Sequence, residues 1–189
     1  MKKTIALILF AAAAACLQAQ TLSWDIRFFR GNDRESIPIS QIIRMETGEP
    51  FQIHIIPASD CYSYIISYDS ERKIHVLYDK PLKKDSTLPF GPIRLQEPAG
   101  TETLYVIMSL EKQEKIETLL LQHKNNPDSN RHTNDLRREI VKLQNELSKL
   151  GEPASAFIPS GGTTRSNTPE YTNRFTGKSA YVRTITIRH

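Results

Sequence analysis

The feature that most limits the possible folds is a series of short segments in which apolar and polar residues alternate. In the first segment the apolar positions are Leu22, Trp24, Ile26 and Phe28. A period of two places such side chains on one face of a β-strand that is half buried in a sheet. Further strands are predicted over residues 51–56, 61–68, 73–78, 93–95 and 103–108. No helix-length pattern separates them, so the segments predict an antiparallel sheet folded as a sandwich or small barrel.

Two helices are expected after these strands. The first covers residues 109–123, with Ser109 as its N-cap, and the second covers residues 133–150, with Thr133 as its N-cap. The second helix carries apolar residues at 4-3-4-3 spacing, which are Leu136, Ile140, Leu143, Leu147 and Leu150. This narrow seam could pair with a second chain as a coiled coil or dock on the chain's own sheet. The seam residues from Leu136 to Leu147 are therefore a candidate interaction surface.

The C-terminal part combines a polar tail with one more alternating segment. Residues 152–176 are rich in Ser, Thr, Gly and Pro, which predicts a loop. In residues 180–189, Ile185 and Ile187 alternate with polar residues, which predicts a terminal strand that returns to the sheet. Together the patterns predict a mainly β (α+β) fold over residues 21–189. It is a single antiparallel β-sandwich-like domain with two appended helices and a C-terminal strand.

The N-terminal residues have the order of an export signal. Lys2 and Lys3 precede an apolar or small-residue run over residues 4–15, and Ala19 follows at a position that suits signal peptidase. We therefore expect residues 1–19 to be a signal peptide that is cleaved after Ala19. The mature protein would then lie in the periplasm, at the outer membrane or outside the cell.

Cys16 offers an alternative way of processing the leader. It follows Ala13-Ala14-Ala15, which forms a loose lipobox, so Cys16 could instead be lipidated and anchor the mature chain. The apolar run is too short to cross a bilayer, which needs about 20 residues, and no later stretch approaches that length. We therefore expect no membrane span, with or without a lipid anchor.

The composition of the mature chain argues against nucleic acid as a partner. Without the leader, the chain has 23 basic and 21 acidic residues, a formal net charge of +2. Binding to nucleic acid normally requires a concentrated basic face, which so small an excess does not predict. Cleavage after Ala19 also leaves Cys61 as the single cysteine, so no internal disulfide is expected.

The residues that could carry chemistry are few. His54, Asp60 and Cys61 could form a cysteine nucleophile with its base and orienting acid. However, Cys61 begins a β-rich run, where a free cysteine usually packs as a small hydrophobic residue. The five histidines show none of the paired spacings of zinc sites. We therefore predict no catalytic residue, no metal site and no cofactor.

Tyr62, Tyr64 and Tyr68 share one strand and are a second candidate interaction surface. Aromatic rings on a sheet can stack on sugars or peptides, which would make this stripe a binding platform. Alternatively, the rings pack against the core or against neighbouring strands.

Residues 48–122 resemble a known family of β-rich domains. The motifs are Gly48-x-x-Phe51 before a strand, Asp60-Cys61-Tyr62-Ser63-Tyr64-Ile65-Ile66, Val76-Leu77-Tyr78, and Gly100-Thr101 leading the segment that ends at Ser109. In this pattern the chain is similar to the family known as domain of unknown function 4384. The resemblance implies a β-rich module that accompanies exported or signalling proteins. It implies no catalytic residues.

These observations favour a non-catalytic exported module that binds a protein or a glycan in the cell envelope. Two alternatives belong to other functional classes. One is a small hydrolase that uses Cys61 and His54, and the other is a structural envelope protein that assembles through the helix at 133–150. The sequence does not predict the oligomeric state.

Overall fold

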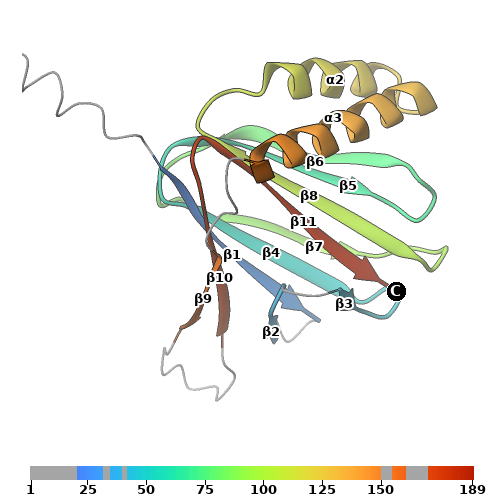
Figure 1. The fold of residues 1–189 in the computed structure, drawn as a ribbon. Coiled ribbons are helices and arrows are strands. Elements are labelled where there is room, and N and C mark those ends of the chain that lie inside the picture. Colours follow the sequence, from blue (N-terminus) through green and yellow to red (C-terminus); the bar gives the residue numbers. More distant parts are fainter. Residues whose placement is uncertain (1–20, 32–34, 40–41, 150–154, 161–169) are drawn as a thin grey trace, which may run out of the picture.

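A computed structural model describes residues 21–31, 35–39, 42–149, 155–160 and 170–189. Two β-sheets face each other, and a pair of helices covers the outer face of one of them, so the molecule has three layers (Figure 1). This architecture confirms the prediction of a mainly β, sandwich-like fold with two helices.

The first sheet has six strands in the order β7-β4-β1-β10-β9, and β2 also pairs with β1. The bounds are β1 (Leu22–Arg30), β2 (Glu35–Ile37), β4 (Pro50–Pro57), β7 (Leu88–Arg94), β9 (Ser155–Ser160) and β10 (Glu170–Gly177). All of these pairs are antiparallel. The alternating apolar residues of β1 are buried between the two sheets, as their period of two predicted.

The second sheet has five strands in the order β3-β11-β8-β5-β6. The bounds are β3 (Ile43–Arg44), β5 (Cys61–Tyr68), β6 (Ile74–Leu82), β8 (Thr101–Ser109) and β11 (Ala180–Arg188). Only β3 and β11 pair in parallel. In β8, Val106 packs between the sheets while Tyr105 and Ile107 pack against the helices. Because β8 is buried on both faces, its sequence is a continuous apolar run.

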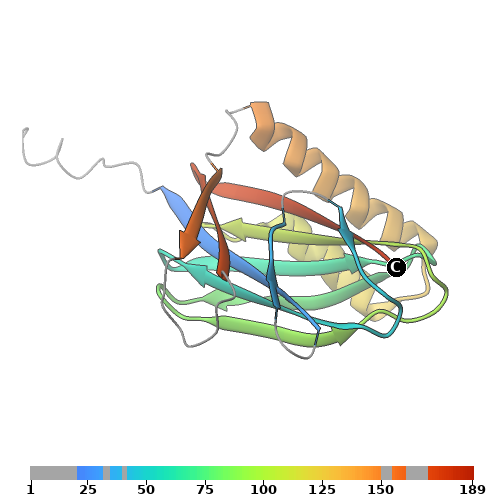
Figure 2. The same cartoon turned by 90° about the horizontal axis from the view of Figure 1, so that it is seen from below.

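The two helices, α2 (Glu114–Asn125) and α3 (Asn130–Lys149), form the third layer. Figure 2, the view from below, shows both of them beyond the strands, on one side of the sandwich. Leu136 and Ile140 of α3 are fully buried in a cluster that includes Ile66 and Ile107 of the second sheet. Leu143 and Leu147 pack partly against the same cluster. The apolar seam of α3 therefore docks on the chain's own sheet, which is one of the two alternatives that the spacing left open.

The predicted starts of both helices are wrong. Ser109 is the last residue of β8, where it pairs with Tyr62 and Ala180, and α2 begins only at Glu114. The hydroxyl of Ser109 instead accepts a hydrogen bond from the Glu111 N–H at 3.3 Å within the connection. Strand pairing thus extends β8 through a residue whose local preference is for a helix cap.

The second helix starts before Thr133, at Asn130. Ser129 precedes it, and its hydroxyl accepts a hydrogen bond from the His132 N–H at 3.3 Å. Ser129 therefore acts as the N-cap.

The predicted loop at 152–176 is wrong in part, because it contains β9 and most of β10. The sequence around Thr172 and Asn173 is polar, yet both residues are buried once β10 pairs with β1 and β9. Such a strand depends on its neighbours rather than on its own residues. The terminal strand expected at 180–189 is confirmed as β11.

Candidate ligand-binding site

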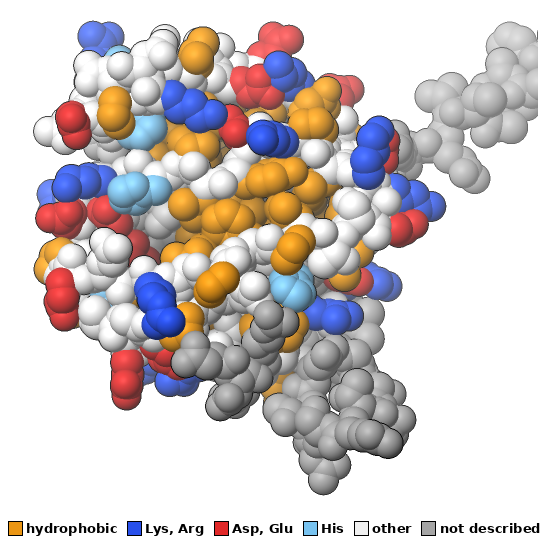
Figure 3. All heavy atoms as spheres, turned by 180° about the vertical axis from the view of Figure 1, so that it is seen from behind, with side chains coloured by type: hydrophobic (Ala, Val, Ile, Leu, Met, Phe, Trp, Pro, Cys, Tyr) orange, Lys and Arg blue, Asp and Glu red, His pale blue; other side chains and the backbone are white. Residues whose placement is uncertain are grey.

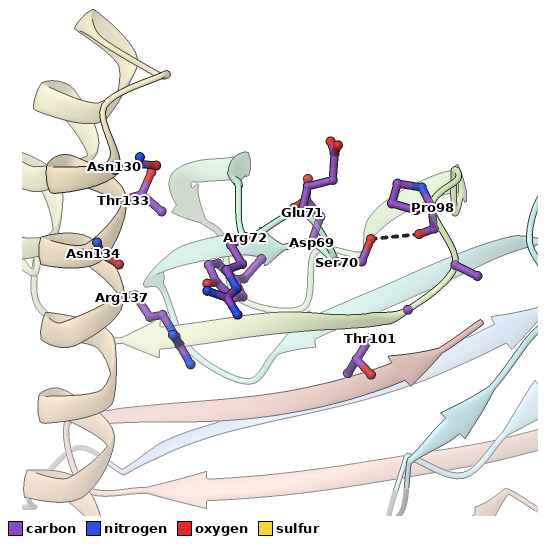
Figure 4. A pocket seen from close by; sticks show the side chains of 13 residues that line it. Asp69, Ser70, Glu71, Arg72, Pro98, Thr101, Asn130, Thr133, Asn134 and Arg137 are labelled. Carbon is purple, nitrogen blue, oxygen red and sulfur yellow. Dashed lines mark hydrogen bonds between the residues drawn. The ribbon is translucent and has the colours of Figure 1, made fainter.

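A polar cleft of about 890 Å³ opens between α3 and two turns of the second sheet. One wall is the first half of α3, and the opposite wall combines the β5–β6 turn with the loop before β8 (Figure 4). The lining residues are Tyr68, Asp69, Ser70, Glu71, Arg72, Pro98, Ala99, Gly100, Thr101, Asn130, Thr133, Asn134 and Arg137. Most of them carry hydrogen-bonding groups, so the cleft suits a polar ligand.

Asp69 shapes the β5–β6 turn. Its backbone carbonyl accepts a hydrogen bond from the Arg72 N–H at 3.0 Å, and its carboxylate accepts one from the Lys73 N–H at 2.7 Å. Arg72 takes a left-handed conformation with φ of 67°. The turn is joined to the neighbouring loop because Ser70 Oγ donates to the Pro98 carbonyl at 2.9 Å (Figure 4). These bonds fix the geometry of one wall.

The opposite wall is held in place by the docking of α3. Asn130, Thr133, Asn134 and Arg137 follow one another at helical spacing on a single face. Asn130 and Asn134 are exposed, whereas Thr133 is only 6% exposed. Within the described part of the chain, the Thr133 hydroxyl makes no hydrogen bond, and Figure 4 shows this side chain projecting from α3 toward the cleft.

The acidic and basic side chains around the cleft have different kinds of partner. The carboxylate of Asp69 lies 2.7 Å from Nε2 of His75, and that of Glu71 lies 2.9 Å from Nζ of Lys73. The guanidinium of Arg137 lies over the ring of Tyr68, 4.6 Å from its centroid. The acidic groups thus have partners close by, while the guanidinium is held by an aromatic ring.

A second hollow, of about 410 Å³, lies between the two sheets at the edge formed by β6 and β7. Its apolar lining comes from both sheets and includes Phe51, Leu77, Ile93 and Leu104. Figure 3 shows hydrophobic side chains gathered across the middle of the face seen from behind. This hollow shares the β5–β6 turn with the polar cleft, and its rim also carries charged side chains such as Lys73 and Glu97.

The tyrosines proposed as a platform face the helices. Tyr64 is 1% exposed, its hydroxyl donates to Glu117 Oε1 at 3.0 Å, and it accepts from the Gln113 N–H at 3.1 Å. Burial, as the largest influence, raises the pKa of Tyr64. Tyr62 and Tyr68 pack partly against the same cluster. Of the three, only Tyr68 lines the polar cleft.

The three residues considered for cysteine chemistry are not brought together. Cys61 points into the core between the sheets, where burial and then the charge of Asp60 raise its pKa to about 11. His54 lies on the face of β4 that points away from that core, and its ring centroid is 4.7 Å from that of Phe29. Asp60 bonds to Nζ of Lys83 at 2.8 Å, and this bond lowers its pKa. A nucleophilic thiol requires a lowered pKa and a nearby base, so this arrangement does not favour one.

The expected processing sites, Ala19 and Cys16, lie outside the described residues. Among the residues that are described, no helix is long and apolar enough to cross a membrane. In the same part of the chain, no three His, Cys, Asp or Glu side chains gather in a way that could hold a metal ion.

Sequence reasoning did not single out Arg72, Asn134 or Arg137, and it considered Thr133 only as a helix cap. A polar face at i, i+3, i+4 and i+7 beside the apolar seam of α3 could have indicated one wall. The other wall depends on the docking of α3 beside the β5–β6 turn, which no local pattern encodes.

No protein-family model matches the chain, no curated protein matches it, and no solved structure matches it. The resemblance of residues 48–122 to domain of unknown function 4384 therefore stays a prediction from the sequence motifs.

Proposed function

We propose that this protein is a non-catalytic, exported module of the cell envelope that binds a glycan in the polar cleft. The observation that carries the proposal is the lining of the cleft, in which neutral hydrogen-bonding groups and charged side chains lie beside an aromatic ring. Thr101, Asn130 and Asn134 offer hydroxyl and amide groups, and Tyr68 supplies the ring. Sugars present many hydroxyl groups, which such groups satisfy, and aromatic side chains combine an apolar body with a polar tip.

Two further observations favour a binding role over hydrolysis. The buried thiol of Cys61 has a raised pKa, so it stays protonated at neutral pH. In addition, His54 lies on the outer face of the first sheet, whereas Cys61 points from the second sheet into the core between the sheets. Replacing Cys61 with Ala should therefore leave unchanged any activity found for the protein, and a loss would support the hydrolase alternative.

Binding should be tested by calorimetry of the exported, processed protein against envelope polysaccharides and their oligosaccharides. Asn134→Ala should weaken binding about tenfold, because one or two hydrogen bonds of about 1 kcal/mol each are lost. Asn145→Ala is the matched control, since Asn145 is an exposed asparagine of the same helix that does not line the cleft. Equal effects of the two substitutions, or no binding to any glycan, would contradict the proposal.

Export itself is tested by fractionation and by the intact mass of the protein. A mass equal to that of a chain starting at Gln20 supports cleavage after Ala19. A mass equal to that of a chain starting at a lipidated Cys16 supports the anchored form. A cytosolic protein that retains Met1 would refute the proposed location.

A further inference from the structure

Two arginines of the cleft lack acidic partners. Arg72 comes from the β5–β6 turn and Arg137 from α3, and Figure 4 shows both side chains reaching into the space between these elements. Throughout the described residues, neither guanidinium has a carboxylate within ion-pair distance. Elsewhere on α3, Arg131 and Arg138 lie 3.7 and 3.6 Å from Asp135. The cleft therefore holds two guanidinium groups that pair with no carboxylate of the described residues.

The acidic residues of the cleft wall are already engaged. Asp69 is bound by His75 and by the Lys73 N–H, and Glu71 is bound by Nζ of Lys73. Turning these carboxylates toward the arginines would break bonds that shape the turn. An anionic group from outside meets less competition, because it can approach Arg72 and Arg137 from the open side of the cleft.

Arg137 is preorganised for such a group. The carbon of its guanidinium lies over the Tyr68 ring, 4.6 Å from the ring centroid. Among the described residues its N–H donors make no hydrogen bond, so they stay available to a ligand. An edge with two parallel donors matches the two oxygens of a carboxylate.

The other groups of the cleft indicate what carries the carboxylate. Thr133 lines the cleft, and in the described part of the chain its hydroxyl makes no hydrogen bond. Asn130, Asn134 and Thr101 add neutral donors and acceptors. A hydroxyl is both a donor and an acceptor, so a ligand hydroxyl can pair with that of Thr133. These neutral groups fit a sugar better than a simple anion.

We propose that the cleft selects an acidic sugar, whose carboxylate binds Arg72 and Arg137 and whose hydroxyls bind Thr133 and the neighbouring amides. This inference rests on the proposed glycan-binding function and adds the chemical class of the glycan. Arg72 and Arg137 provide the selectivity for charge, and the groups on α3 provide the selectivity for hydroxyls.

The test compares uronate oligosaccharides with their carboxyl-reduced forms, in which a neutral CH₂OH replaces the carboxylate. Galacturonan, alginate and hyaluronan oligosaccharides serve as probes in calorimetry at low salt. We expect the acidic form of at least one probe to bind tenfold or more tightly than its reduced form. Arg72→Gln and Arg137→Gln should each remove most of that difference without changing the weak binding of the reduced form. Arg131→Gln, which removes a charge on the same helix outside the cleft, should change neither.

The possible outcomes separate the two proposals. If the acidic and reduced forms bind equally, the selectivity for acid is refuted while glycan binding stands. If no probe binds in either form, the acidic-sugar assignment is overturned, and calorimetry with neutral envelope glycans then decides the broader proposal. If inorganic phosphate binds as tightly as the best uronate, the cleft is a site for simple anions and the sugar assignment is wrong. Circular dichroism spectra of the variants must match that of the parent, because a misfolded variant would mimic the expected loss.

Discussion

Replacing Ile140 with Ala should destabilise the protein strongly, because the side chain is fully buried between α3 and the second sheet. Truncating a buried Ile to Ala costs about 2–5 kcal/mol, which includes the lost transfer free energy and the cavity left behind. The side chain packs between α3 and the second sheet, and we expect a loss near the middle of this range, about 3 kcal/mol. With a slope of about 2 kcal/mol per molar urea, the unfolding midpoint should fall by about 1.5 M. Circular dichroism at several urea concentrations measures this shift.

Val141→Ala is the matched control on the same helix, because Val141 is 40% exposed. The small loss of apolar contact is offset by the better helix propensity of alanine, so the midpoint should move by less than about 0.3 M. Both midpoints should be independent of protein concentration, since the seam docks within one chain. Equal shifts for the two variants, together with a midpoint that rises with concentration, would refute the intramolecular packing of α3. The seam would then pair with a second chain.

Two further predictions concern buried groups of the second sheet. The pKa of Cys61 rises from an ordinary value of 9.0 to about 11 on folding, so the unfolded chain loses the thiol proton first as the pH rises. The stabilisation that comes from the protonated Cys61 thiol is complete below pH 9 and is lost between about pH 9 and 11. In urea titrations across this range, the free energy of unfolding should therefore decline less for Cys61→Ala than for the parent. Tyr64→Phe removes the hydroxyl that donates to Glu117 and accepts from the Gln113 N–H. We expect the free energy of unfolding, measured from the urea midpoint, to fall by about 1–2 kcal/mol. A stability equal to that of the parent would show that water replaces the hydroxyl.

The sequence was most informative where burial alone determines the structure. The alternation in β1 and the apolar run in β8 predicted the strands, because each pattern reflects which faces are buried. The heptad spacing of α3 predicted a narrow apolar seam, and the structure supplies the sheet on which it docks.

The sequence was least informative where distant segments determine the local structure. Residues 170–177 are mostly polar and become strand β10 by pairing with β1 and β9. Ser109 has the local preference of a helix cap, but its pairing with Ala180 keeps it in β8. The cleft depends on such distant contacts as well, because Arg72 and Arg137 line one cleft only when α3 docks beside the β5–β6 turn.

The positions of the last two strands have a consequence for synthesis. In the first sheet β10 lies between β1 and β9, and in the second sheet β11 lies between β3 and β8. The ribosome delivers both strands after all the other described strands. Until then β8 has an unpaired edge, and β1 is unpaired along residues 22–26 on the side opposite β4. The pairs β1–β10 and β8–β11 join residues far apart in the sequence, and closing such long loops slows folding. We therefore expect both sheets to stay incomplete until β10 and β11 have been synthesised. A product truncated before residue 170 would keep both edges unpaired and should aggregate.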